Sequence, residues 1–181
     1  MRALTIALWV VGWLPVAVAD GQTTTAIDTR PQQRLEFLIG KWNYAGEDLK
    51  SPFGPGGSTA TMFGCEWLPG QFFVVCREDG RIGEGDFAKL EIYGYSIETI
   101  SYTYTSFDSS GTSQSQRCTI QARTLSCRGH DRTPRGQLLA TRSVMQPEGM
   151  LADRFVFIWE YSVDGKIWSV GGSGQVTRDR K

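Results

Sequence analysis

The sequence predicts an all-β domain in which about ten antiparallel strands close into an up-and-down barrel behind one short helix. From residue 41 to residue 177, short segments alternate apolar and polar residues and are separated by clusters of Gly, Pro, Asp and Ser. No segment after residue 40 combines the length and the 3.6-residue period of a helix. A sheet of consecutive hairpins exposes two unpaired edges unless it closes on itself, which favours a barrel.

The chain before the strands predicts export. Residues 1–19 begin with one basic residue, Arg2, continue with a short apolar stretch and end in an Ala-x-Ala sequence, which is typical of a signal peptide cleaved after Ala19. The alternative is an uncleaved anchor, for which this apolar stretch is short of the roughly 20 residues that a spanning helix needs. Residues 20–30 are polar and are expected to form a flexible leader. The barrel domain is expected to cover residues 31–178.

A short helix is expected from Pro31 to Phe37, because proline favours the first helical position. Leu35 and Leu38 would share one side of it, and Gly40 would end it. Such a helix is suited to closing one mouth of a barrel.

The strands are expected in rapid succession, joined by short turns and by one longer loop over residues 51–57. Asp164-Gly165 predicts a two-residue type I′ turn in the last hairpin, because glycine readily adopts positive φ. The expected strands cover residues 42–47, 59–68, 72–78, 86–95, 100–107, 113–121, 124–130, 137–146, 151–163 and 166–177.

Four cysteines in an exported chain predict two disulfides. If Ala122-Arg123 forms a two-residue turn, Cys118 lies opposite Cys127, at a separation that a disulfide can span. The second pair is Cys65 with Cys76. A two-residue turn at Pro69-Gly70 would place Cys65 opposite Val74 instead, so this pairing needs a longer turn or a bulge. A metal site in place of the disulfides lacks the CxxC spacing and the paired histidines that it would require.

The charge balance of the chain gives no sign of a strongly charged binding surface. The full chain has 19 basic and 19 acidic residues, and removal of residues 1–19 takes away a single base. A chain so close to neutrality lacks the basic footprint of a protein that binds nucleic acid or an anionic membrane. No integral membrane segment is expected after cleavage.

The final hairpin carries the strongest aromatic signal. Phe155, Phe157, Trp159 and Tyr161 alternate and therefore share one face of their strand. With a two-residue turn, Tyr161 would face Trp168, and the phenylalanines would face glycines, a pairing in which a ring covers exposed backbone in a bent sheet. The face is either one wall of a ligand cavity or part of a filled core, since a barrel of roughly eight strands does one or the other.

The candidate ligand-binding residues are aromatic residues expected on inward faces, with tyrosine hydroxyls supplying a few orienting polar contacts. They are Trp42, Tyr44, Phe63, Tyr102, Tyr104, Phe157, Trp159 and Trp168.

No catalytic residue, metal site or cofactor is predicted. His130, which could in principle ligate haem or act as a base, is expected to be exposed in a turn. Most carboxylates, Glu78 and Glu91 among them, are expected at turns or on outward positions. No nucleophile elbow and no phosphate-binding glycine loop is present.

Residues 35–42 resemble the opening of calycin-type barrels, with Gly40-x-Trp42 matching the Gly-x-Trp element of lipocalins. In those proteins the tryptophan packs across the closed end and often meets an arginine near the last strand, a place that Arg178 would occupy here. More closely, residues 33–177 resemble a bacterial family known as domain of unknown function 1579. The motifs that carry this likeness are the opening segment, Trp67-Leu68-Pro69-Gly70, Gly94-Tyr95 and the run from Tyr104 to Gly111.

The resemblance implies a calycin-like barrel, related to fatty-acid-binding proteins and to haem-binding nitrobindins, with no assigned ligand. We therefore expect a periplasmic or secreted protein that binds a small apolar or amphipathic molecule in its cavity. An envelope interaction protein with a packed interior is the second hypothesis. An enzyme acting on a small apolar substrate is the third, and an inward Glu91 or Glu160 with a partner would favour it.

Overall fold

The structure is a computed structural model that describes residues 30–149 and 153–180. The expected signal peptide, its cleavage site and residues 20–29 of the leader lie outside the described residues.

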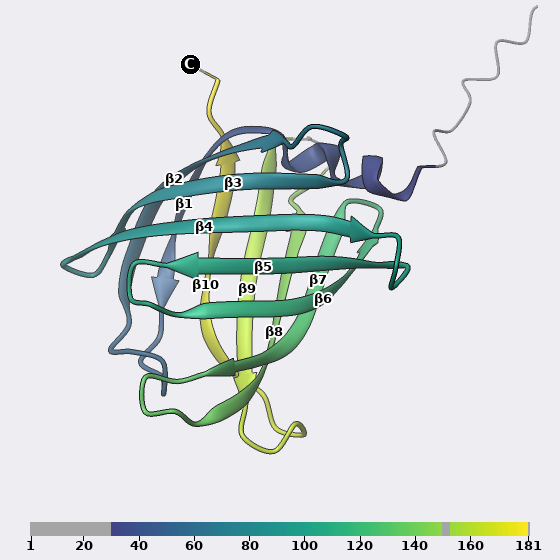
Figure 1. The fold of residues 1–181 in the computed structure, drawn as a ribbon. Coiled ribbons are helices and arrows are strands. Elements are labelled where there is room, and N and C mark those ends of the chain that lie inside the picture. Colours follow the sequence, from purple (N-terminus) through teal and green to yellow (C-terminus); the bar gives the residue numbers. More distant parts are fainter. Residues whose placement is uncertain (1–29, 150–152, 181) are drawn as a thin grey trace, which may run out of the picture.

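The described chain folds into a closed barrel of ten antiparallel strands behind one 3-10 helix (Figure 1). Each strand pairs with the next in sequence, and the first pairs with the last, so the sheet has no free edge. This confirms the predicted fold class. The elements are η1 (Pro31–Leu38), β1 (Gly40–Asp48), β2 (Gly57–Trp67), β3 (Phe73–Ile82), β4 (Gly85–Ser96), β5 (Ser101–Asp108), β6 (Ser113–Gln121), β7 (Thr124–Arg132), β8 (Leu138–Pro147), β9 (Arg154–Ser162) and β10 (Ser169–Arg178).

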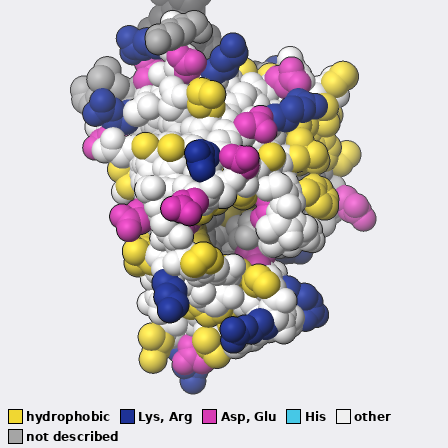
Figure 2. Space-filling view, turned by 90° about the vertical axis from the view of Figure 1, so that its left-hand side faces the viewer, with side chains coloured by type: hydrophobic (Ala, Val, Ile, Leu, Met, Phe, Trp, Pro, Cys, Tyr) yellow, Lys and Arg dark blue, Asp and Glu magenta, His cyan; other side chains and the backbone are white. Residues whose placement is uncertain are grey.

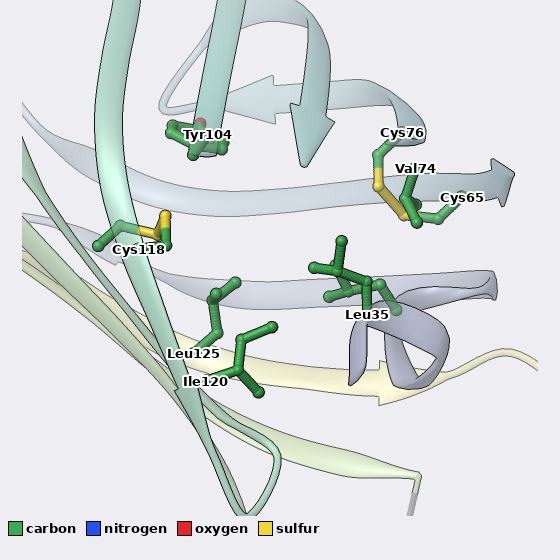
Figure 3. Close-up of a cluster of buried hydrophobic side chains, with 10 residues drawn as sticks. Leu35, Cys65, Val74, Cys76, Tyr104, Cys118, Ile120 and Leu125 are labelled. Carbon is green, nitrogen blue, oxygen red and sulfur yellow. A yellow bond between two sulfur atoms is a disulfide. The ribbon is translucent and has the colours of Figure 1, made fainter. Parts of the chain in front are cut away.

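The helix η1 closes one end of the barrel. Leu35 and Leu38 are buried, at 0% and 4% exposure, in a cluster that includes Val74 of β3 and Leu125 of β7. Figure 3 shows Leu35 reaching from the helix toward the side chains of these strands. The core of the molecule therefore lies at the helix end of the barrel, and the interior is free to be hollow further along.

An aromatic ring and a cation stabilise the seam, which is the pairing of the first strand with the last. Trp42 of β1 lies opposite Arg178 of β10, whose guanidinium carbon is 4.1 Å from the centre of the indole ring. The indole nitrogen donates to the Leu38 carbonyl at 2.8 Å, and Arg178 donates to the Ile39 carbonyl at 2.8 Å. These contacts tie the helix to the seam, and they match the tryptophan–arginine pairing expected from the likeness to lipocalins.

Both predicted disulfides are present and both face the barrel interior. Cys118 lies directly opposite Cys127, and Cys65 directly opposite Cys76, each with 4.0 Å between Cα atoms. The second pairing is possible because the connection between β2 and β3 spans residues 68–72 and is longer than two residues. All four cysteines are buried.

The last hairpin differs from the prediction. Its connection runs over residues 163–168, because the Asp164 side chain accepts hydrogen bonds from the backbone of Lys166 at 2.8 Å and Ile167 at 2.9 Å, which stabilises a wider loop. Ser169 takes the expected place of Trp168 opposite Tyr161. Trp168 consequently lies outside the strands.

A bulge at Gly171 then shifts the register, so that Phe155 lies opposite Val176 and not opposite a glycine as expected, while two other rings of β9 lie opposite glycines. Trp159 pairs with Gly172, and Phe157 pairs with Gly174. A Cβ atom at Gly171 would lie 2.2 Å from the Trp159 ring. The glycines are therefore required for these rings to cover the backbone of β10.

Candidate functional site: the barrel cavity

The barrel encloses a cavity of about 470 Å³ that opens at the end opposite η1. The opening is bordered by residues of the β1–β2, β5–β6 and β7–β8 connections, among them Phe53, Ser110 and Pro134, and by Ile82 at the end of β3. Figure 2 views this end of the molecule, and the surface is hollowed near the centre of that face. A cavity of this size falls within the range of small-molecule binding sites.

One wall of the cavity is aromatic. Tyr44, Phe63, Phe157 and Trp159, four of the candidate ligand-binding residues, line it. Tyr44 and Phe157 meet edge to face, with 5.9 Å between ring centroids. Phe53, from the β1–β2 loop, packs against Trp159 at 5.7 Å and extends this wall toward the opening. Tyr104 lines the opposite, polar side.

Three of the eight predicted ligand-binding residues do not line the cavity. Trp42 is 2% exposed and packs in the closed end against Phe155. The Tyr102 hydroxyl donates to the Pro31 carbonyl at 2.6 Å and thereby holds the start of η1. Trp168 lies in the β9–β10 connection with its ring 4.2 Å from the guanidinium of Arg142. The alternation of residues placed Trp168 wrongly on an inward face, because the wider loop takes this residue out of the strand.

The polar side contains an ion pair whose carboxylate, Glu91, was expected at an outward position. Lys89 and Glu91 of β4 point inward, with 2.7 Å between the Lys89 nitrogen and a Glu91 oxygen. The Tyr104 hydroxyl donates to the same Glu91 oxygen at 2.9 Å. Burial alone would lower the pKa of Lys89, but the combined attraction of Glu91, Tyr104 and Glu78 outweighs it, and the pKa is raised well above its ordinary value. Lys89 is therefore charged at neutral pH.

Glu78 of β3 also points inward, contrary to the expected outward position. It lines the cavity and accepts a short hydrogen bond from the Thr61 hydroxyl. Burial, followed by the charge of Glu91, raises the pKa of Glu78 to about 7. The same carboxyl contributes to the raised pKa of Tyr44, which is caused mainly by burial and by Asp48. A carboxyl with such a pKa can exchange a proton near neutrality.

A second polar cluster lies on β6, β7 and β8. Asp131 is 1% exposed, and one of its oxygens accepts hydrogen bonds from Thr141 at 2.6 Å and from Gln116 at 3.3 Å. Burial raises the pKa of Asp131, while the hydrogen bonds from Thr141 and Gln116 oppose the shift. The neighbouring His130 is exposed, as expected, but lies within β7 and not in a turn. It therefore points away from the cavity.

The alternation pattern contained a signal for these missed residues. Glu78 is two positions from Cys76, and Asp131 is four positions from Cys127, so each shares a strand face with an interior cysteine. Lys89 and Glu91 likewise share a face with Tyr93. The inward position of the disulfides therefore identifies the strand face that lines the cavity. The general preference of charges for the surface favoured the assignment of these charged residues to the outer face.

The described residues contain no group of three or more His, Cys, Asp or Glu side chains arranged to hold a metal ion. Within the same residues, none of the helical segments has the length and apolarity to cross a bilayer.

Comparisons with known proteins show the fold. No protein family model matches the chain, and no curated protein matches it in sequence. Among solved structures, the chain is similar to the S-type phycobiliprotein lyase CPES from Guillardia theta, with a TM-score of 0.51 and 11% sequence identity. The match covers 83% of this chain and 93% of the other. This chain thus shares the barrel fold of that protein, and at this identity the likeness extends to the fold alone.

Proposed function

We propose that this protein binds a small amphipathic molecule inside the barrel. The observation that carries the proposal is the cavity of about 470 Å³, open at one end, with an aromatic wall on one side and buried polar groups on the other. Aromatic surface gains free energy by covering the apolar part of a ligand, and a few fixed polar groups orient the rest. Tyr44, Phe63, Tyr104, Phe157 and Trp159 are the residues that we assign to ligand contact.

The same cavity argues against the hypothesis of a packed interior. Protein interiors are close-packed, with few voids larger than a water molecule. A purely structural barrel would be expected to fill the space between Tyr104 and Phe157 with side chains. Among the described residues, the interior is filled at the η1 end, where Leu35 and Leu38 are buried against the strands.

Filling the cavity tests the proposal. Ser143 of β8 lines the cavity, whereas its neighbour Val144 pairs with the exposed Ile158 on the outer face. We expect Ser143→Trp to abolish binding of the fluorescent apolar probe Nile red, and Val144→Trp to leave it unchanged. Native mass spectrometry of the chain purified from its own host should also reveal a bound small molecule that Ser143→Trp lacks. Equal probe binding by the two variants would refute a site inside the barrel.

An enzyme acting on a small amphipathic substrate is a second candidate, favoured by one observation. Glu91 points inward with Lys89 and Tyr104 as partners, and the neighbouring Glu78 has a pKa raised to about 7, which suits a general base. If this candidate holds, the molecule recovered from wild-type protein should be chemically altered relative to the molecule recovered from Glu78→Gln. An identical bound molecule in both would leave binding as the function.

We further propose that the protein works in the periplasm or outside the cell. Two disulfides form and persist in oxidising compartments, and they agree with the signal peptide predicted in residues 1–19. We also propose that the resemblance of residues 33–177 to domain of unknown function 1579 reflects a family relationship.

A further inference from the structure

Two buried oxygen atoms in the cavity wall have no hydrogen-bond partner among the described residues. They are Oε1 of Gln116 and Oδ1 of Asp131, whose side chains are 7% and 1% exposed and line the cavity. An unsatisfied buried polar atom costs about 1–3 kcal/mol, so such atoms are rare unless something else satisfies them. Both atoms belong to the same cluster, so a ligand that satisfies them must supply hydrogen-bond donors at this place in the cavity.

The surrounding hydrogen bonds make both atoms acceptors. The Gln116 amide nitrogen donates to Asp131 Oδ2 at 3.3 Å and to Thr141 Oγ1 at 3.1 Å, while the Thr141 hydroxyl donates to the same Asp131 oxygen at 2.6 Å. Reversing the amide would set its oxygen against the carboxylate and lose both donations. The atom left without a partner is therefore the amide oxygen, which can only accept.

A glycine in the middle strand allows the side chains of this cluster to meet. Gly129 of β7 pairs with Gln116 on one side and with Thr141 on the other. A Cβ atom at position 129 would lie 2.7 Å from Gln116 Cγ, so the absence of a side chain is what allows the two polar side chains to meet above this strand. Asp131, two residues further along β7, then completes the group.

The charge of the cavity also favours a donor, and specifically a cation. Five carboxylic residues and two basic residues line the cavity, and both bases are engaged by carboxylates. Lys89 pairs with Glu91 at 2.7 Å, and Arg142 binds Glu160 through two hydrogen bonds of 2.6 and 3.0 Å. The lining carboxylic residues are Asp48, Glu78, Glu91, Asp108 and Asp131.

We propose that the ligand carries a protonated amine, held by Gln116 Oε1 and Asp131 Oδ1, with its apolar part against Phe157 and Trp159. This inference rests on the proposed function, because it names the chemical class of the molecule in the same cavity. An ammonium group supplies N–H donors to both acceptors and a positive charge to the excess of carboxylates. A fatty acid, which would add another carboxylate, is disfavoured at this position.

Displacement of Nile red by three ligands of equal chain length tests the inference. Octylamine, octanol and octanoate share one apolar tail and differ in the head group. With the chain from residue 20 to residue 181 at neutral pH, we expect octylamine to displace the probe at a concentration at least about tenfold lower than octanol, since hydrogen bonds to charged groups contribute about 1.5–3 kcal/mol. Octanoate should be the weakest of the three.

Two variants assign the preference to the acceptor pair. Asp131→Asn removes the charge and Gln116→Met removes the amide oxygen, each with little change in size. In both, the concentration of octylamine that displaces Nile red should approach the concentration of octanol that does so in the same variant. Asp86→Asn is the matched control, because the Asp86 side chain is 99% exposed on β4 and should leave the preference intact.

The outcomes separate this inference from the proposed function. If Nile red does not bind the wild-type chain, the proposed function fails. If Nile red binds but octanol or octanoate displaces it as well as octylamine, the ligand class is wrong and the binding function stands. An octylamine preference that survives in both variants would also overturn the inference, because the selectivity would then come from other residues. Should one variant fail to fold, the other still tests the acceptor pair, and the comparison of the three ligands on wild-type protein decides the ligand class.

Discussion

Replacing Glu78 by glutamine should change how the stability of the barrel depends on pH. In the folded protein, burial and the neighbouring Glu91 raise the pKa of Glu78 from 4.5 to about 7. Between these values the folded state binds a proton that the unfolded state has released, so stability falls as pH rises through this window. The Glu78→Gln variant has no such proton to release, and it should lack this component of the pH dependence.

The magnitude follows from the size of the shift. One pKa unit corresponds to about 1.4 kcal/mol, so the difference in unfolding free energy between wild type and Glu78→Gln should fall by up to about 3 kcal/mol from pH 4 to pH 8. Urea unfolding of the two oxidised proteins at closely spaced pH values measures this difference, and other titrating groups largely cancel. The wild type should lose stability relative to the variant with rising pH.

The control is Glu66→Gln. Glu66 lies on β2 with a side chain that is 71% exposed and paired with Arg77 at 3.1 Å. Exposed pairs contribute about 0–1 kcal/mol, so this substitution should give a nearly flat difference. A flat or rising difference for Glu78→Gln would show that the carboxyl does not experience the buried, negative surroundings that the structure describes.

Two further predictions concern the closed end and the disulfides. Arg178→Ala should destabilise the barrel by about 1–3 kcal/mol, because it removes the cation over Trp42 and the hydrogen bond to the chain entering β1; a thermal unfolding midpoint equal to that of wild type would contradict the role of this seam. The double substitution Cys118→Ser, Cys127→Ser should lower the free energy of unfolding by about 2–3 kcal/mol, as expected for a short cross-linked loop with a sequence separation of 9. Denaturant unfolding with and without reductant measures this loss. A variant as stable as the oxidised protein would show that the cross-link does not stabilise the barrel.

The barrel itself could be predicted because each hairpin carries its own local signal. Cys118 and Cys127 lie at equal distances from Ala122-Arg123, and both turn residues adopt positive φ in the structure, so counting outward from the turn predicts the pairing. Closure then follows from the physical cost of free edges. The last hairpin escaped this counting, since the Asp164 side chain stabilises a wider loop and Gly171 introduces a bulge.

The cavity chemistry was harder to predict, because it depends on which strand face is turned inward and on contacts between side chains of different strands. Glu91 and Tyr104 meet on neighbouring strands, but nothing in either strand alone indicates that a carboxylate, a lysine and a tyrosine satisfy one another in the interior. Composition favours such charges at the surface. The unsatisfied oxygens of Gln116 and Asp131 depend on contacts among three strands and on the space above Gly129. Only the three-dimensional arrangement reveals them.

The position of the seam has a practical consequence. Figure 1 shows that β10 ends at the same end of the barrel as η1. Arg178 donates to the Ile39 carbonyl there, while the cavity opens at the opposite end. A tag or surface attachment joined beyond Arg178 therefore starts on the far side of the molecule from the entrance. Immobilised protein would present its opening to the solution, so the ligand measurements described above can be made on a sensor chip without the linker competing for the entrance.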